Sequence, residues 1–220
     1  MFLLGIKLGG ENFLNTYIFL KRIRKNLKKY YHIISIKQYD KRTDLTVVEE
    51  EAVNIYNDEK YIIKKPRFSQ DKRPVKTVYA NPVILVNPSG AHAEKDFIRR
   101  KDVPAEVFFY IKGEKWEIEN DERHLGHNFY IPEHILLQDL IRVINDNRLI
   151  IKNIPDFSSS LAKELKKLQC LGTDMKEDIF PSIDNFENKD ILLSMSMPVW
   201  FYENYLDIRS SGRSKYGERR

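Results

Sequence analysis

The chain has 220 residues, of which 42% are hydrophobic and 31% are charged, and its formal charge at pH 7 is +5. This length suits one large globular domain, and the composition is too apolar for a chain that is disordered throughout. No apolar run is long enough to span a bilayer, and the N-terminus lacks a secretion signal. The single cysteine, Cys170, excludes an internal disulfide and favours an intracellular setting.

The first patterned stretch is Phe2 to Gly10, FLLGIKLGG, a short apolar run that ends in two glycines. A run of this length bounded by glycine fits a buried, central strand better than a helix. Because side chains alternate across a strand, Leu4, Ile6 and Leu8 share one face and Lys7 lies on the other. Lysine is rarely buried without a partner, so we expect either an acidic side chain beside Lys7 or an opening to water.

Two more strands are expected, at 15–24 and 30–39, joined by a basic turn at 24–29. Three consecutive strands with short connections predict an antiparallel meander. Helical spacing of apolar residues follows over 43–61, where Thr46 and Glu49 could form a capping box.

The rest of the chain alternates between strands and helices. Residues 64–81 are polar and basic and are expected to form a loop or a protruding arm, and 113–127 a polar excursion. Strands are expected at 83–86, 106–111 and 148–154, and helices at 91–100, from Pro132 onward, at 158–168 and at 190–205, where Pro198 should cause a kink or break. This order predicts an α/β fold with a mixed sheet, built from the meander plus parallel strands and flanked by helices.

Basic residues are clustered in two stretches. Residues 21–42 contain nine Lys or Arg against one acid, and residues 60–76 contain seven against one. Such clusters are the electrostatic footprint that a polyanion requires, although solvated strand edges and loops explain them equally well. The candidate DNA-facing residues are Lys21, Arg22, Arg24, Lys25, Lys28, Lys29, Lys64, Lys65, Arg67, Lys72 and Arg73.

Four tyrosines lie near these basic residues, namely Tyr30, Tyr31, Tyr39 and Tyr61. Aromatic rings beside lysines can stack on nucleic-acid bases. Packing against a sheet explains them as well or better, so both interpretations stay open.

Five local phrases occur in a characteristic order: GIKLGG at 5–10, VILVNPSG at 83–90, the long stretch 129–157, LAKELKKL at 161–168 and NKDILLSMSMPVW at 188–200. Together they resemble the nuclease domain of tailed-phage large terminase subunits. The resemblance covers nearly the whole chain, and it implies an RNase H-like fold. No phosphate-binding loop of an ATPase motor occurs in the sequence.

In that family, acids at adjacent strand ends hold two divalent cations roughly 4 Å apart, which activate water and stabilise the leaving oxygen. The resemblance places the acid positions at Lys7, Asn87 and Asp190, so one carboxylate is left of the family's set. A protonated lysine repels a cation, and asparagine supplies oxygen without charge. We therefore expect that the metal site is lost.

The ammonium of Lys7 is expected to pair with Asp190 and to take the place of a missing cation, because a buried unpaired lysine is costly. The alternative is that Lys7 extends to solvent. An active site would require substitute acids, and Glu11, Asp40 and Glu94 lie near expected strand ends. In that case Asp190 and Glu11 would bind Mg²⁺ or Mn²⁺.

The sequence thus predicts a catalytically inactive terminase nuclease-like domain of phage or prophage origin over residues 1–208, followed by a basic flexible tail at 209–220. It should bind double-stranded DNA or dock to portal or other packaging proteins, without a cofactor or a membrane, in the cytoplasm of a bacterial or archaeal host. Two alternatives stay open: an active metal-dependent endodeoxyribonuclease with non-standard acids, and a structural interaction domain that contacts no nucleic acid.

Overall fold

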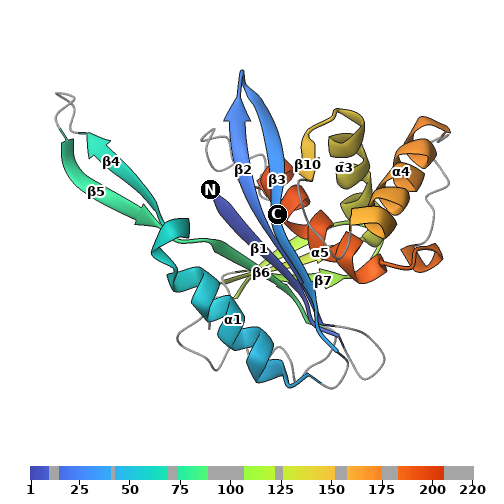
Figure 1. Cartoon of the computed structure of the whole chain (residues 1–220), viewed down its shortest axis with the longest axis horizontal. Helices are drawn as coiled ribbons and strands as arrows, with labels where there is room; N and C mark the ends of the chain where they lie inside the picture. Colours follow the sequence, from blue (N-terminus) through green and yellow to red (C-terminus); the bar gives the residue numbers. More distant parts are fainter. Residues whose placement is uncertain are drawn as a thin grey trace, which may run out of the picture.

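The structure is a computed structural model that describes residues 1–9, 15–40, 43–68, 74–88, 107–121, 126–151, 158–174 and 183–205. Its centre is an eight-stranded mixed sheet with helices on both faces, and a separate two-stranded hairpin extends away from it (Figure 1). The prediction of an α/β, RNase H-like mixed sheet is confirmed. None of the helices within the described ranges is long and apolar enough to cross a membrane.

The strand order in the sheet is β10-β3-β2-β1-β6-β7-β9-β8. β1 pairs antiparallel with β2 and β2 with β3, which confirms the meander, whereas β6, β7 and β9 continue the sheet in parallel from β1. The bounds are β1 Phe2–Lys7, β2 Thr16–Lys25, β3 Lys28–Gln38, β6 Val83–Asn87, β7 Val107–Ile111, β8 Glu117–Asp121, β9 Gly126–Ile131 and β10 Leu149–Ile151.

The turn between β2 and β3 is tighter than the sequence suggested. Lys25 pairs with Lys28, so Asn26 and Leu27 alone form the connection. Both residues have positive φ angles, 50° and 65°, which is the backbone of a two-residue hairpin turn that matches the twist of its strands. As a result, the basic residues stand on the strands rather than in a loop.

The two faces of the sheet carry separate cores. On one face α3 (Glu133–Asn145), α4 (Ser158–Asp174) and α5 (Lys189–Trp200) pack over a large cluster that includes Leu3, Ile18 and Tyr31. On the other face α1 (Leu45–Asn57) covers a smaller cluster that includes Leu4 and Phe19. The alternation of β1 side chains inferred from the sequence is therefore confirmed.

The helix α5 is buried along its length, from Asp190 to Trp200, because it lies between the sheet and α3 (Figure 1). Pro198 lies inside α5, and the chain then continues as a π-helical turn, Phe201–Tyr205. The expected irregularity near Pro198 is thus a widened turn immediately after the helix.

The structure corrects or refines three local predictions. The N-cap of α1 is Asp44, whose carboxylate accepts a hydrogen bond from the Thr46 amide at 2.9 Å, and not a capping box from Thr46 to Glu49. Of the two alternatives for 64–81, a loop or a protruding arm, the structure shows the arm, a hairpin of β4 (Ile63–Phe68) and β5 (Pro74–Ala80). The polar stretch 113–127 contains β8, which pairs with β9 at the edge of the sheet, and the start of β9. The expected helix at 91–100 and the tail at 209–220 lie outside the described residues.

Candidate functional site

Two of the three family acid positions meet at one end of the sheet. Lys7 is the last residue of β1, and it lies in register with Asn87, the last residue of the parallel strand β6. Both side chains are buried, at 7% and 6% exposure. The adjacent parallel strands therefore bring the ammonium and the amide to the same edge, as the resemblance implied.

Asp190 completes this cluster from the first turn of α5. Its Oδ1 lies 2.7 Å from the Lys7 Nζ, and the two side chains are 10% and 9% exposed. The contact is a close ion pair rather than a well-aligned hydrogen bond. The expected pairing of Lys7 with Asp190 is confirmed, and the alternative in which Lys7 extends to solvent is wrong.

A close approach between β1 and α5 positions this pair. A Cβ atom added to Gly5 would lie 2.2 Å from the Ser194 carbonyl oxygen and 3.0 Å from Pro198 Cδ. Pro198 has no N–H to bond the carbonyl four residues before it, which is Ser194. This geometry allows helix α5 to contact the strand backbone directly at Gly5, one turn after Asp190.

Asn87 links β6 to its other neighbour. Its side-chain amide donates a 2.6 Å hydrogen bond to the Phe109 carbonyl of β7. The backbone pairing of β6 with β7 ends one residue earlier, at Val86 and Phe108. The Asn87 side chain therefore extends the sheet by one bond and serves the fold at the position of a family acid.

The N-terminus of α5 has a second anchor that sequence reasoning did not assign. Glu164 on α4 is buried, and it accepts a 3.0 Å hydrogen bond from the Asn188 backbone amide. Glu164 is the acid of the LAKELKKL phrase. A carboxylate at a helix N-terminus satisfies a backbone donor that has no partner in the helix, so Glu164 helps to fix the orientation of Asp190.

The cluster does not fit a divalent metal. It has one cation, one neutral amide and one carboxylate, and the ammonium lies directly on the carboxylate. Within the described ranges, no group of three or more His, Cys, Asp or Glu side chains could hold a metal ion. Of the possible substitute acids, Asp40 is exposed beyond the end of β3, whereas Glu11 and Glu94 lie outside the described residues.

The basic candidates of the first cluster fall into two groups. Lys21, Arg24, Lys25 and Lys28 are exposed on the β2–β3 hairpin. Arg22 and Lys29 lie on the same face as Arg24, opposite to Lys21, Lys25 and Lys28, and they are partly buried there. The structure thus leaves four of the six candidate residues exposed, with Lys21, Lys25 and Lys28 on one face of the hairpin and Arg24 on the other.

The second basic cluster lies on the β4–β5 hairpin, which projects from the end of α1 (Figure 1). Lys64 is exposed at the start of β4, and Lys65 and Arg67 are on the same strand. Lys72 and Arg73 lie outside the described residues. The predicted protruding arm is confirmed in this form.

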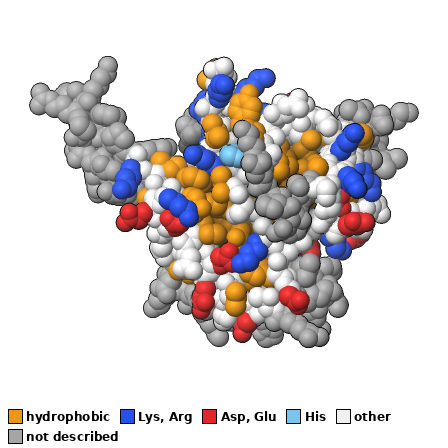
Figure 2. Space-filling model, in the orientation of Figure 1, with side chains coloured by type: hydrophobic (Ala, Val, Ile, Leu, Met, Phe, Trp, Pro, Cys, Tyr) orange, Lys and Arg blue, Asp and Glu red, His pale blue; other side chains and the backbone are white. Residues whose placement is uncertain are grey.

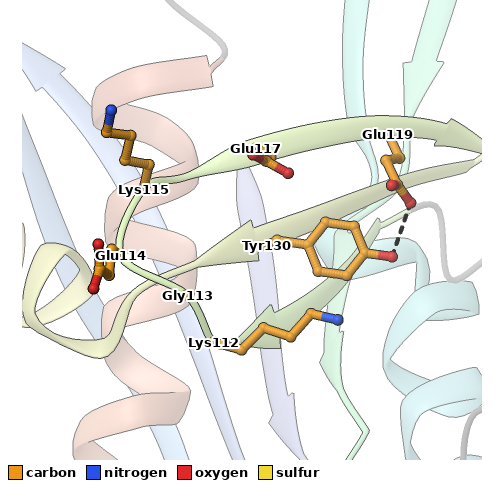
Figure 3. A pocket seen from close by; sticks show the side chains of 7 residues that line it. All are labelled: Lys112, Gly113, Glu114, Lys115, Glu117, Glu119 and Tyr130. Carbon is orange, nitrogen blue, oxygen red and sulfur yellow. Dashed lines mark hydrogen bonds between the residues drawn. The ribbon is translucent and has the colours of Figure 1, made fainter.

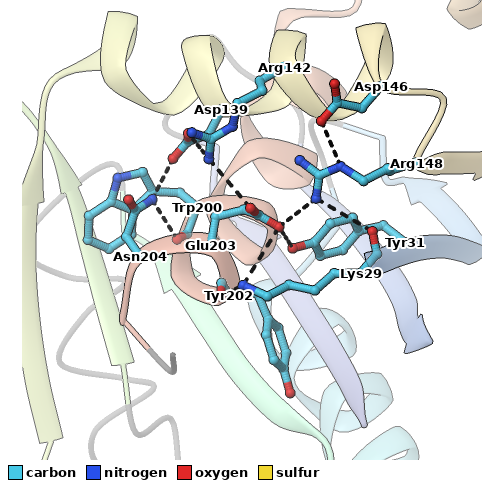
Figure 4. A network of polar contacts seen from close by, with 10 residues as sticks. All are labelled: Lys29, Tyr31, Asp139, Arg142, Asp146, Arg148, Trp200, Tyr202, Glu203 and Asn204. Atoms are coloured by element: carbon cyan, nitrogen blue, oxygen red, sulfur yellow. Dashed lines mark hydrogen bonds and ion pairs between the residues drawn. The ribbon is translucent and has the colours of Figure 1, made fainter. Parts of the chain in front are cut away.

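Lys29 belongs to a polar network that the sequence did not reveal (Figure 4), and Arg22 lies beside it. Its centre is Glu203 in the π-helical turn, which accepts a hydrogen bond from the Tyr31 hydroxyl and forms a 2.9 Å ion pair with Arg148. Lys29 donates to the Tyr202 carbonyl at 3.2 Å, and the Arg22 guanidinium lies 4.2 Å from the Tyr202 ring centroid.

The partners of Glu203 in this network compensate for the burial of its carboxylate. Burial raises the pKa of Glu203, but the hydrogen bonds from Tyr31 and Arg148 outweigh it and leave that pKa below its ordinary value. Burial also raises the pKa of Asp139, the neighbouring acid that bonds Asn204 (Figure 4). Because its partners come from several elements of the sheet and helices, we assign the network a structural role.

One surface pocket, of about 500 Å³, lies at the turn between β7 and β8 (Figure 3). Three glutamates and two lysines line it together with Gly113 and Tyr130, and the Tyr130 hydroxyl donates to Glu119 at 2.9 Å. The lining mixes opposite charges on exposed side chains, so the pocket favours no particular ligand class.

No significant match to the chain was found among protein-family models, curated proteins or solved structures.

Proposed function

We propose that this chain is a catalytically inactive relative of the nuclease domain of tailed-phage large terminase subunits, which binds DNA or docks DNA-packaging components. The observation that carries the proposal is the ion pair between Lys7 and Asp190 beside Asn87. The sequence resemblance assigns these three positions to the metal-binding acids of that family.

The physical argument against catalysis is electrostatic. A two-metal nuclease needs several carboxylates to balance the charge of two divalent cations. Here the only carboxylate of the cluster is already neutralised by an ammonium at 2.7 Å. A cation would have to displace the Lys7 ammonium from its contact with Asp190 in a buried position, which costs several kcal/mol.

The argument for DNA binding is the β2–β3 hairpin. Its exposed lysines and arginine lie together on two paired strands, and Lys25 and Lys28 are direct register partners at the tip. Like charges placed opposite each other destabilise a strand pair. Such an arrangement is favourable when a polyanion neutralises it, and release of counterions then makes binding strongly salt-dependent.

Cleavage of supercoiled plasmid with Mg²⁺ or Mn²⁺ tests the loss of catalysis. We expect no nicking by the natural chain. Nicking that disappears in Asp190→Asn would refute the proposal and identify an active endonuclease. A double variant, Lys7→Asp with Asn87→Asp, brings the cluster to three carboxylates and is expected to bind Mn²⁺. The matched control adds Asp190→Asn to this variant and is expected to bind Mn²⁺ more weakly.

Titration of a labelled DNA duplex at several salt concentrations tests the binding surface. Charge reversal at the tip, Lys25→Glu with Lys28→Glu, should weaken binding. It should also reduce the slope of log affinity against log salt concentration by about 1.8, which is about 0.9 for each of two lost phosphate contacts. The control is Lys163→Glu with Lys166→Glu, two exposed lysines on α4. Equal losses in both variants would mean that binding is not localised at the hairpin.

A further inference from the structure

The sheet face that carries α1 is only partly covered by that helix. α1 contacts β6, and the chain after it folds into the short helix η1 (Glu59–Tyr61), whose Tyr61 packs on Phe2 and Phe19. β2 and β3 continue beyond this point as the projecting hairpin (Figure 1). On this face of the sheet, none of the helices within the described ranges lies over that extension.

Strand register defines which side chains occupy this extension. Arg22 and Lys29 contact Tyr202 on the α5 side, so their neighbours in sequence point the other way. The register pairs Lys21 with both Phe2 and His32, and Ile23 with Tyr30. We call the surface formed by Phe2, Lys21, Ile23, Tyr30, His32 and Tyr61 the hairpin face.

The hairpin face is apolar and aromatic although it is open to solvent. Ile23 is 37% exposed, and Tyr30, His32, Phe2 and Tyr61 are all partly exposed. Figure 2 shows hydrophobic side chains gathered above α1, with Lys and Arg side chains beyond them at the hairpin. The solvent-facing side of an antiparallel sheet usually carries polar residues, so this apolar composition indicates a binding surface.

Lysines surround the aromatic rings at short range. The Lys21 Nζ lies 5.3 Å from the Phe2 ring centroid, and the Lys60 Nζ lies 4.5 Å from that of Tyr61. Lys25 and Lys28 stand farther along the same strands. Aromatic rings with cations at their edges match a ligand that has flat apolar faces and a regular array of negative charges.

We propose that the hairpin face binds single-stranded DNA, a proposal that rests on the DNA-binding function above and specifies the form of DNA. Unpaired bases expose the flat faces that stack on Phe, Tyr and His, whereas a duplex hides them within its own stack. The lysines then contact the phosphates of the same strand. Of the four tyrosines noted in the sequence, Tyr30 and Tyr61 are on this face, whereas Tyr31 and Tyr39 are buried.

Fluorescence anisotropy with a labelled oligothymidine and a duplex of equal length tests the proposal on the full chain. Tyr30→Leu keeps an apolar side chain but removes the stacking ring, and it should weaken oligothymidine binding about tenfold and duplex binding little. Lys21→Gln should lower the salt slope for the single strand by about 0.7. The matched controls are Tyr130→Leu and Lys112→Gln, a half-buried tyrosine and its lysine 4.4 Å from the ring at the other end of the sheet.

The outcomes separate this inference from the general function. If duplex and single strand bind equally and Tyr30→Leu binds like the natural chain, the hairpin face is not a stacking site, although DNA binding stands. If neither DNA form binds, both proposals fail. Circular dichroism and thermal melting check that each variant is folded. Lys21 is exposed, so Lys21→Gln still decides the question if Tyr30→Leu is unstable.

Discussion

The ion pair between Lys7 and Asp190 should dominate the local stability of this fold, and a double-mutant cycle can measure it. Asp190→Asn keeps the shape of the side chain but removes the negative charge that Asp190 places beside the buried ammonium of Lys7. Lys7→Met removes the ammonium and leaves the Asp190 carboxylate unneutralised. The double variant Lys7→Met with Asp190→Asn combines the two substitutions and removes both charges.

The expected magnitudes follow from burial. The two side chains are 9% and 10% exposed, so solvent screens the contact poorly. Removing one partner of a buried pair costs about 3–5 kcal/mol, whereas replacing both by apolar residues is often close to neutral. For a chain of this size, about 1 kcal/mol corresponds to a shift of about 2–4 °C in Tm.

Chemical denaturation of the four proteins gives the coupling energy. We expect each single variant to lose about 3 kcal/mol or more of the free energy of unfolding, and the double variant to lose much less, with a coupling of at least about 2 kcal/mol. If Asp190→Asn loses less than about 0.5 kcal/mol, the pair is solvated as a surface ion pair would be, and the argument that an ammonium replaces the cation is refuted.

Three further substitutions test other contacts that stabilise the fold. Gly5→Ala should lose at least about 1–3 kcal/mol in denaturant unfolding, because its Cβ would lie 2.2 Å from the Ser194 carbonyl oxygen. Glu203→Gln should lose about 3 kcal/mol at neutral pH. The folded-state pKa of Glu203 lies below its ordinary value of 4.5, so this stabilisation is present above that pH and is lost as pH falls through the lower value; acid titration of unfolding should show a flatter curve for the variant. Asp44→Ala should cost about 0.5–2 kcal/mol by thermal melting, since its carboxylate caps α1 at Thr46.

The elements that the sequence predicted well are those with strong periodic patterns. The run from Phe2 to Lys7 and the run VILV are continuous apolar segments that become neighbouring central strands, β1 and β6. Their pairing places Lys7 beside Asn87, and this register depends on the alignment of two strands far apart in sequence. The resemblance supplied that alignment, because no local pattern in either strand specifies it.

The elements that were missed have polar sequences whose structure depends on tertiary pairing. β8 reads Glu-Ile-Glu-Asn-Asp, a composition that is rare in strands, and it forms because it pairs along the edge of β9. Likewise, no sequence pattern around Glu203 predicted its role. It becomes the centre of a buried network because the π-helical turn after α5 directs it to Tyr31 and Arg148. Neither arrangement follows from local propensity.

The response of Tm to Mg²⁺ tests the proposal that the Lys7 ammonium replaces a cation. If Lys7 fulfils the electrostatic role of the cation, the natural chain should have the same Tm with EDTA or with Mg²⁺, since its charge balance is internal. The variant Lys7→Asp with Asn87→Asp places two carboxylates at the ends of β1 and β6, beside that of Asp190 on α5. Their repulsion should lower Tm when no divalent cation is present. Mg²⁺ should then raise its Tm, with about 2.7 kcal/mol of added stability at a concentration of 100 times Kd. A natural chain that Mg²⁺ stabilises to the same extent would show that a cation site persists beside Lys7, and a variant that Mg²⁺ does not stabilise would show that the three positions do not converge as a metal site.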